Sequence, residues 1–268
     1  WNSMYDPGEI NPPEIREESI EAKPDIFKRQ RARSREHLMS PRDWAELTAH
    51  YYGLISFLDD QLGRILSALR DGGYMDDSII IFTSDHGTSL GHHGYYGKFY
   101  NFECSTKVPL LIHVPGQSDG EAISKTNKSI DIMPAILERC GISVPGDLQG
   151  QNLNRLINHD DADWDESVYT EMHGIHRNKD NTNPRLLEYR KGLRLKDWKI
   201  SYHVSKIDEN SPWRHEWELY NYTIDQEEFE NLAGNPEYTE QFDNMKNELL
   251  LAMCMYESCI DFSKYGKE

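Results

Sequence analysis

The sequence predicts an α/β protein: part of a mostly parallel sheet flanked by helices, followed by a small antiparallel sheet with one helix packed on it. Residues 79–82 and 108–114 are short, almost continuous apolar runs, which are typical of strands buried on both faces. A long helical pattern precedes the first run, as in an α/β crossover. Strand-like segments beyond residue 160 lead to one amphipathic helix. We therefore expect two domains, residues 1–160 and residues 161–268.

The long helix is predicted to begin directly after Ser40. Ser40 is suited to the N-cap, Pro41 to the first helical position, and Asp43 supplies a carboxylate at the third. From Trp44 onward, apolar residues recur at spacings of three and four as far as Leu69. An Asp-Gly-Gly sequence then ends the pattern, so a helix of about 28 residues is expected.

Residues 1–39 are rich in Pro, Glu and Arg and lack sustained periodicity. They predict a long surface connection. The basic residues between Lys28 and Arg35 are expected to be solvated, partly helical and paired with acidic residues, and the alternative is a contact with an acidic polymer or substrate.

The region beyond residue 108 predicts a second buried strand, two helices and a run of four further strands. Gly141 stops the first helix, and Pro134 is tolerable there only because it falls in the first turn. The expected helices are Ile130–Cys140 and Pro236–Tyr256, and the expected strands are Val168–Met172, Tyr189–Leu195, Trp198–His203 and Glu216–Tyr220.

Composition excludes two classes of partner. The formal net charge of −17 argues against a general nucleic-acid binder, because such proteins displace counterions with Lys and Arg. No apolar run approaches the length of about 20 residues that spans a bilayer, and the first residues lack the apolar core of a signal peptide. We expect no nucleic acid and no membrane as partners, whereas an anionic small substrate is compatible with cations gathered at one site.

The candidate site follows the first apolar run. Asp85 and His86 come just after this strand, and in open α/β sheets ligands bind beyond the carboxyl ends of the strands. The glycine-rich loop that follows carries His92, His93 and Lys98. A carboxylate and an imidazole can hold calcium, magnesium, manganese or zinc, and a lysine can bind an anion. Without this context, Asp-His-Gly is an ordinary turn and Lys98 an ordinary surface lysine.

The segment SDHGTSLGHHGYYGK, residues 84–98, followed by NFECSTKVPLLIHVPG, resembles the sulfatase family of the alkaline phosphatase superfamily. Downstream, the sequences Asp131-Ile-Met-Pro, Asp197-Trp-Lys and Glu218-Leu-Tyr are similar to that family's C-terminal pattern, and the likeness extends from about residue 44 to 250. The resemblance implies an alkaline-phosphatase-like sheet and a sulfuric ester hydrolase acting on a sulfate ester, with a sulfated sugar as one candidate. It also implies a periplasmic, secreted or lysosomal location.

The resemblance also implies roles for individual residues. Asp85 and His86 would bind a divalent metal, with calcium the first expectation, and Lys98 would contact a sulfate oxygen on which negative charge grows. His93 would hydrogen-bond the ester or orient Lys98, or it would instead cap the loop. His173 and Arg177, expected in a loop after a strand, would select the leaving group of the substrate.

The chain departs from the family in one respect. No Cys or Ser precedes an x-Pro-Ser-Arg sequence, so the formylglycine nucleophile and the acidic pair that completes the metal site are expected on a segment not present in this chain. We therefore expect the C-terminal portion of a sulfatase, with the N-terminal portion of the same enzyme as its partner. Two alternatives stay open: a phosphonate or phosphodiester hydrolase of the same superfamily, and a non-catalytic binding relative.

Overall fold

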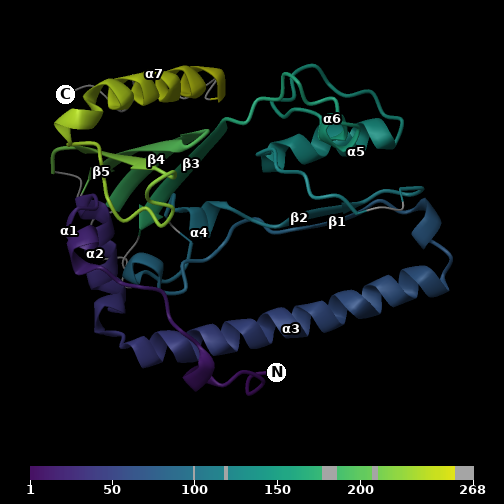
Figure 1. The fold of residues 1–268 in the computed structure, drawn as a ribbon, viewed down its shortest axis with the longest axis horizontal. Helices are drawn as coiled ribbons and strands as arrows, with labels where there is room; N and C mark the ends of the chain where they lie inside the picture. Colours follow the sequence, from purple (N-terminus) through teal and green to yellow (C-terminus); the bar gives the residue numbers. More distant parts are fainter. Residues whose placement is uncertain (99, 118–119, 177–185, 207–210, 257–268) are drawn as a thin grey trace. The chain divides into compact units, whose positions relative to one another are not determined.

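The computed structural model describes residues 1–98, 100–117, 120–176, 186–206 and 211–256 (Figure 1). Contacts within the chain divide it into two compact units, Trp1–Gly120 and Glu121–Glu268. This division lies earlier than the predicted domain boundary after residue 160, because residues 121–160 make most of their contacts with the second unit. Among the residues described, no helix is both long enough and apolar enough to cross a membrane.

The longest helix of the first unit is α3, Pro41–Asp71. Its predicted start is confirmed: the Asp43 N–H donates to Ser40 Oγ at 3.3 Å, and the Ser40 N–H donates to the Asp43 carboxylate at 2.7 Å. This reciprocal capping box satisfies two backbone donors that the first helical turn leaves without partners. The helix ends before Gly73, which has a φ of 74°.

The expectation of a surface connection over residues 1–39 was wrong. The segment forms α1, Glu17–Glu21, and α2, Asp25–Ser34, and buries Ile20 and Phe27 to 2% and 0% exposure. Short helices with few apolar residues give too little periodicity to be recognised, although those few residues are enough to anchor them. The expected pairing of the basic cluster is confirmed by the ion pair between Arg31 and Glu17 at 2.9 Å.

Strands β1, Ile80–Thr83, and β2, Leu110–His113, form where the two apolar runs predict them. They pair with each other antiparallel, so the expected parallel arrangement does not apply to this pair. Phe82 and Leu111, which face each other in the register, are 45% and 59% exposed, so burial on both faces is not seen among the described residues. An apolar run indicates that a strand suits a buried position, but it carries no information on the direction of its neighbour.

The second unit holds an antiparallel sheet in the order β3-β4-β5-β6, and α7 lies along one face of it (Figure 1). All four predicted strands and the helix are confirmed, with longer strands than expected. Apolar residues from β4, β5 and β6 pack against α7 to make the core of this unit. The elements are β3 Val168–His176, β4 Leu186–Leu195, β5 Trp198–Lys206, β6 Arg214–Asn221 and α7 Thr239–Tyr256.

Two short helices precede the sheet in the second unit: α5, Ile132–Arg139, and α6, Asn154–Ile157. The α5 prediction is confirmed, and Pro134 lies in its first turn as expected. Just before α5, the buried carboxylate of Asp131 accepts the N–H groups of Lys128 and Gln151, both at 2.7 Å. The Asp131 side chain therefore ties the start of α5 to the loop that leads to α6.

Candidate functional site

Asp85 and His86 lie just after β1, at the start of the predicted site loop. The Asp85 Oδ1 atom accepts the His86 N–H at 2.9 Å, which fixes the carboxylate next to the imidazole. The His86 Nδ1 atom lies 2.9 Å from the Gly87 carbonyl oxygen. Because a carbonyl oxygen only accepts, Nδ1 donates in this contact, and Nε2 is the ring nitrogen left for another partner.

That nitrogen faces the Asp85 carboxylate. His86 Nε2 lies 3.3 Å from Asp85 Oδ2, and the Asp85 side chain is 82% exposed. Two acceptors at this distance repel each other unless a proton or a cation lies between them. A divalent cation would bring together one carboxylate oxygen and one imidazole nitrogen here. Within the described residues, however, no group of three or more His, Cys, Asp or Glu side chains could hold a metal ion, so the metal-binding role of this pair stays a prediction.

Backbone hydrogen bonds frame the loop that follows. The Gly87 N–H donates to the Ser105 carbonyl at 2.8 Å, and the Ser89 N–H donates to the Gly97 carbonyl at 2.7 Å. A Cβ added at Gly87 would lie 2.2 Å from the Cys104 carbonyl oxygen, so this close approach requires glycine. The Asp85–His86 end of the loop and the residue before Lys98 are therefore held by one hydrogen-bonded frame.

Lys98 leaves this frame directly after Gly97. Its side chain is exposed, and among the described residues it makes no hydrogen bond or ion pair. An ammonium group in this state is available to a bound anion. The same exposure also fits a surface lysine, so the role of Lys98 stays a prediction.

His93 is buried, with 4% of its surface exposed, and has a φ of 55°. Its ring lies against Phe102 at a centroid distance of 4.2 Å. Of the two roles left open by the sequence, this packing supports the one in which His93 fixes the loop. A direct contact of His93 with the ester stays a prediction.

Beneath the loop lies an aromatic cluster that the sequence reasoning missed. Phe27 of α2 contacts Tyr100 at 5.3 Å between ring centroids, and Tyr100 contacts Tyr95 at 4.3 Å. These rings and Phe102 are all no more than 2% exposed. The available signal was the group of five aromatic residues between positions 95 and 102, but the sequence did not reveal their partner on α2.

The substrate residues predicted in the second unit are only partly described. His173 was expected in a loop but lies inside β3, because the β3–β4 pairing continues as far as His176 and Leu186. Its Nε2 atom is 3.5 Å from the Lys191 Nζ atom and 3.7 Å from the Glu171 carboxylate. Arg177 lies outside the described residues.

Lys191 links the polar residues around His173. Its ammonium donates to the Glu171 carboxylate at 2.9 Å, although the Lys191 side chain is only 4% exposed. Burial is the largest single effect and raises the pKa of Glu171, but the hydrogen bond and charge of Lys191, together with those of His173, outweigh it, so the pKa is lowered. His173, which is 40% exposed, thus stands beside an ionised pair at a solvent-accessible position.

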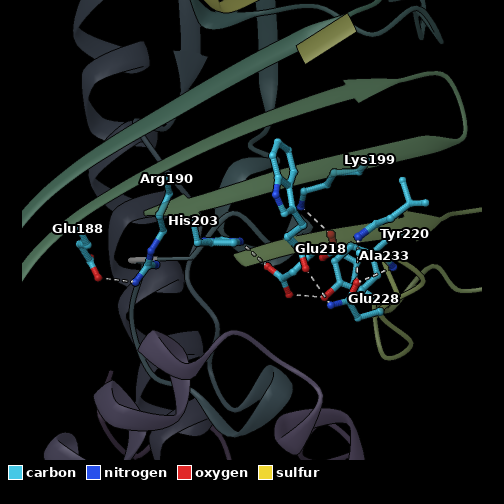
Figure 2. A network of polar contacts seen from close by, with 11 residues as sticks. Glu188, Arg190, Lys199, His203, Glu218, Tyr220, Glu228 and Ala233 are labelled. Atoms are coloured by element: carbon cyan, nitrogen blue, oxygen red, sulfur yellow. Dashed lines mark hydrogen bonds and ion pairs between the residues drawn. The ribbon is translucent and has the colours of Figure 1, made fainter. Parts of the chain in front are cut away.

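A second polar cluster lies on the sheet face opposite the α7 core, and Figure 2 shows its side chains meeting. Lys199 of β5 donates to Glu228 at 2.5 Å, and the Tyr222 hydroxyl donates to the same carboxylate at 2.8 Å. On the neighbouring rungs, Glu218 accepts from the Tyr220 hydroxyl and lies 2.7 Å from His203 Nε2. Burial, and next the charge of Glu218, raises the pKa of Tyr220 well above its usual value.

These groups are buried, with 1% to 8% of their surface exposed, so the cluster has no access to a substrate. The hydrogen bonds of this cluster explain why the Glu218-Leu-Tyr sequence and the residues around Glu228 occur together. The bonds join β5 and β6 to the loop that returns toward α7. We therefore assign this cluster a structural role.

The comparisons with known proteins agree with the fold and the loop. A family model described as sulfatase matches residues 11–142. A second model, described as the C-terminal part of N-sulphoglucosamine sulphohydrolase, matches residues 91–253. These matches cover both the Asp85–Lys98 loop and the antiparallel sheet. The fold class is thus that of the α/β hydrolytic enzymes of the alkaline phosphatase superfamily, and the chain belongs to the sulfatase family within it.

Individual relatives are similar over most of this chain. An N-acetylglucosamine-6-O-sulfatase from Bacteroides thetaiotaomicron is 29% identical over 195 residues, which cover 71% of this chain and 33% of that protein. A solved structure of a protein in complex with its substrate D-glucosamine-2-N,6-O-disulfate is 27% identical, with a TM-score of 0.65, and the match covers 87% of this chain and 47% of that one.

A phosphonate monoester hydrolase from Silicibacter pomeroyi has a TM-score of 0.75 at 23% identity, over 94% of this chain and 52% of that one. Because the sequence identity is below 25%, this similarity is evidence for the fold and not for the activity. Across these three proteins the chain spans between a third and about half of the relative's length.

Proposed function

We propose that this chain forms the part of a sulfuric ester hydrolase that carries two metal ligands and a sulfate-contacting lysine. The observation that carries the proposal is the pair of acceptors, Asp85 Oδ2 and His86 Nε2, which lie 3.3 Å apart while Nδ1 is committed to a backbone carbonyl. A cation between them satisfies both. Membership in the sulfatase family supports the choice of reaction.

The metal is proposed to be calcium, held by Asp85 and His86 together with ligands from outside this pair. A hard cation of this kind prefers oxygen ligands and tolerates an irregular coordination shell, which suits an exposed carboxylate at the mouth of a loop. When bound, the cation supplies positive charge that favours the ionised nucleophile and the sulfate oxygens.

Lys98 is proposed to bind an oxygen of the sulfate group. Its ammonium is a compact charge on a flexible stem, and the frame that ends at Gly97 sets where that stem begins. As the S–O bond breaks, negative charge grows on the oxygens, and a cation held in place stabilises that state by about 3 kcal/mol. The formylglycine nucleophile is proposed to come from a segment outside the 268 residues.

That segment, the N-terminal portion of the enzyme, is proposed to be the partner of this chain. The apolar residues exposed on β1 and β2, and those exposed on α3 such as Leu58 at 56% and Ile65 at 59%, support a covering partner. An uncovered strand edge of this kind is otherwise an aggregation hazard.

The substrate is proposed to be a sulfated sugar, with His173 and Arg177 contacting its leaving group. The exposed imidazole of His173 beside the ionised Lys191–Glu171 pair offers hydrogen-bonding groups of the kind that sugar hydroxyls need. The names of two relatives, an N-acetylglucosamine-6-O-sulfatase and a protein bound to D-glucosamine-2-N,6-O-disulfate, support this substrate class.

Hydrolysis of a phosphonate monoester is the second candidate, supported by the solved structure of a phosphonate monoester hydrolase of Agrobacterium radiobacter, which is 26% identical with a TM-score of 0.64. The experiment compares turnover of an aryl sulfate and an aryl phosphonate monoester by the full-length protein. We expect the sulfate to have the higher kcat/KM. A preference for the phosphonate would replace the proposed reaction, and no turnover of either, with metal binding retained, would indicate a binding protein.

Lys98→Ala in the same protein should lower kcat/KM for the aryl sulfate by roughly 100-fold or more, because the charge on the sulfate oxygens loses its partner. Lys107→Ala is the matched control, since Lys107 is another exposed lysine of the same unit. An unchanged rate in Lys98→Ala would remove the role assigned to Lys98.

A further inference from the structure

The loop that ends at Lys98 rests on the N-terminal helices through charged side chains. The Tyr96 N–H donates to the Glu36 carboxylate at 2.9 Å, a contact between residues 60 positions apart. Glu36 is only 7% exposed, so the bond lies in a protected environment. A carboxylate that accepts a backbone N–H makes a charge-assisted bond, which is stronger than a neutral one. This bond holds the backbone two residues before Lys98.

A second charged contact lies a few residues earlier in the loop. Arg31 of α2 makes two hydrogen bonds with the Glu17 carboxylate, at 2.9 Å and 3.0 Å, and its side chain is 11% exposed. The guanidinium lies directly against Gly94, where an added Cβ would stand 3.0 Å from Arg31 Nε. Hydrogen bonding from Arg31 lowers the pKa of Glu17, so the pair is ionised at neutral pH.

The loop itself has little intrinsic stiffness. Gly94 and Gly97 have φ values of 70° and 92°, and glycine at such positions has many accessible conformations. Contacts from outside the loop must therefore select one of them. Glu36 and the Glu17–Arg31 pair are such contacts, and they come from the N-terminal segment of residues 1–39.

We propose that Glu36 and Arg31 are positioning residues for Lys98. They hold the backbone from Gly94 to Tyr96 so that the Lys98 ammonium stands at the sulfate oxygens before the substrate arrives. This inference rests on the proposed function, because it acts through the role of Lys98. A displacement of about 1 Å at a catalytic group is enough to lower a rate by roughly 100-fold.

The test is a double-mutant cycle in the full-length protein with an aryl sulfate as substrate. Glu36→Ala is expected to lower kcat by roughly 10- to 100-fold with little change in KM. Glu36→Gln should retain most of the activity, because its amide oxygen still accepts the Tyr96 N–H. In the Lys98→Ala background, Glu36→Ala should change kcat by less than about 2-fold, since coupled residues are not additive. Glu46→Ala is the control, because Glu46 is exposed and forms an ion pair with Arg42 on α3.

Gly94→Ala provides an independent variant should Glu36→Ala fold poorly. The added Cβ meets Arg31 and strains the backbone, so it should show the same loss of kcat and the same lack of additivity with Lys98→Ala. Equal losses in the wild-type and Lys98→Ala backgrounds would overturn the proposal, as would full activity of Glu36→Ala. An unchanged rate in Lys98→Ala alone would instead overturn the proposed function, which separates the two failures.

Discussion

Asp85 and His86 illustrate how single residues acquire a chemical role from their neighbours. An Asp-His-Gly sequence has several ordinary interpretations, and the contact between His86 Nδ1 and the Gly87 carbonyl is what leaves Nε2 facing the carboxylate. The sequence correctly placed these residues after a strand. It carried no information on which ring nitrogen faces the carboxylate, because that depends on a turn of the backbone.

At the same scale, Lys199 and Glu228 form a buried ion pair, and its contribution to the free energy of unfolding depends on both partners being present. Both side chains are no more than 6% exposed. Removing one partner leaves an uncompensated buried charge, so Lys199→Met should destabilise the chain by about 3–5 kcal/mol.

Adding Glu228→Gln to Lys199→Met should restore part of that stability, because the unpaired carboxylate is removed. Denaturant unfolding followed by tryptophan fluorescence measures both effects, and Lys107→Met serves as the exposed control. A loss below about 1 kcal/mol in Lys199→Met would contradict a buried, ionised pair.

Elements with a strong local signal were predicted well. The Ser40–Asp43 capping box defines the start of α3, and the four strand-like segments beyond residue 160 correspond to the sheet from β3 to β6. Helices α1 and α2 were missed because Ile20 and Phe27 are isolated apolar residues among charged ones. The contact between Glu36 and Tyr96 could not be predicted, because the sequence near each residue does not indicate a partner 60 positions away.

The start of α5 offers a prediction on pH. Asp131 is fully buried, and burial raises its pKa above the ordinary value of 3.8 in spite of its backbone hydrogen bonds. The folded state therefore binds this proton more readily than the unfolded state. The contribution of Asp131 to stability is greatest below pH 3.8 and falls as the pH rises through the raised pKa.

Asp131→Asn keeps an oxygen acceptor but cannot ionise. The stability of the wild type relative to this variant should thus be higher at pH 4 than at pH 7, as measured by urea unfolding at each pH. The difference between the two proteins isolates Asp131 from the carboxylates whose pKa is lowered, such as Glu166. A difference that is independent of pH, or of opposite slope, would contradict the assigned effect of burial.

On the scale of the whole chain, the fold class and family follow from residues that lie far apart in sequence. The loop from Asp85 to Lys98 belongs to the first unit, and the sheet with the Glu218–Tyr220 cluster belongs to the second. The β1–β2 pair departs from the expected parallel sheet, and its exposed apolar side chains are matched by those of α3. Pairing direction and coverage depend on neighbouring segments, so the apolar runs alone did not predict them.

The central claim is that Asp85 and His86 hold the cation of a sulfatase site. Its most direct test is the rate of aryl sulfate hydrolysis by full-length Asp85→Asn protein, measured across a calcium titration, beside the exposed control Asp76→Asn. We expect Asp85→Asn to lose at least about 100-fold in kcat/KM at low calcium and to recover partly as calcium rises, because the amide is a weaker ligand than a carboxylate. Asp76→Asn should behave as the wild type. Wild-type activity and calcium dependence in Asp85→Asn would contradict the account.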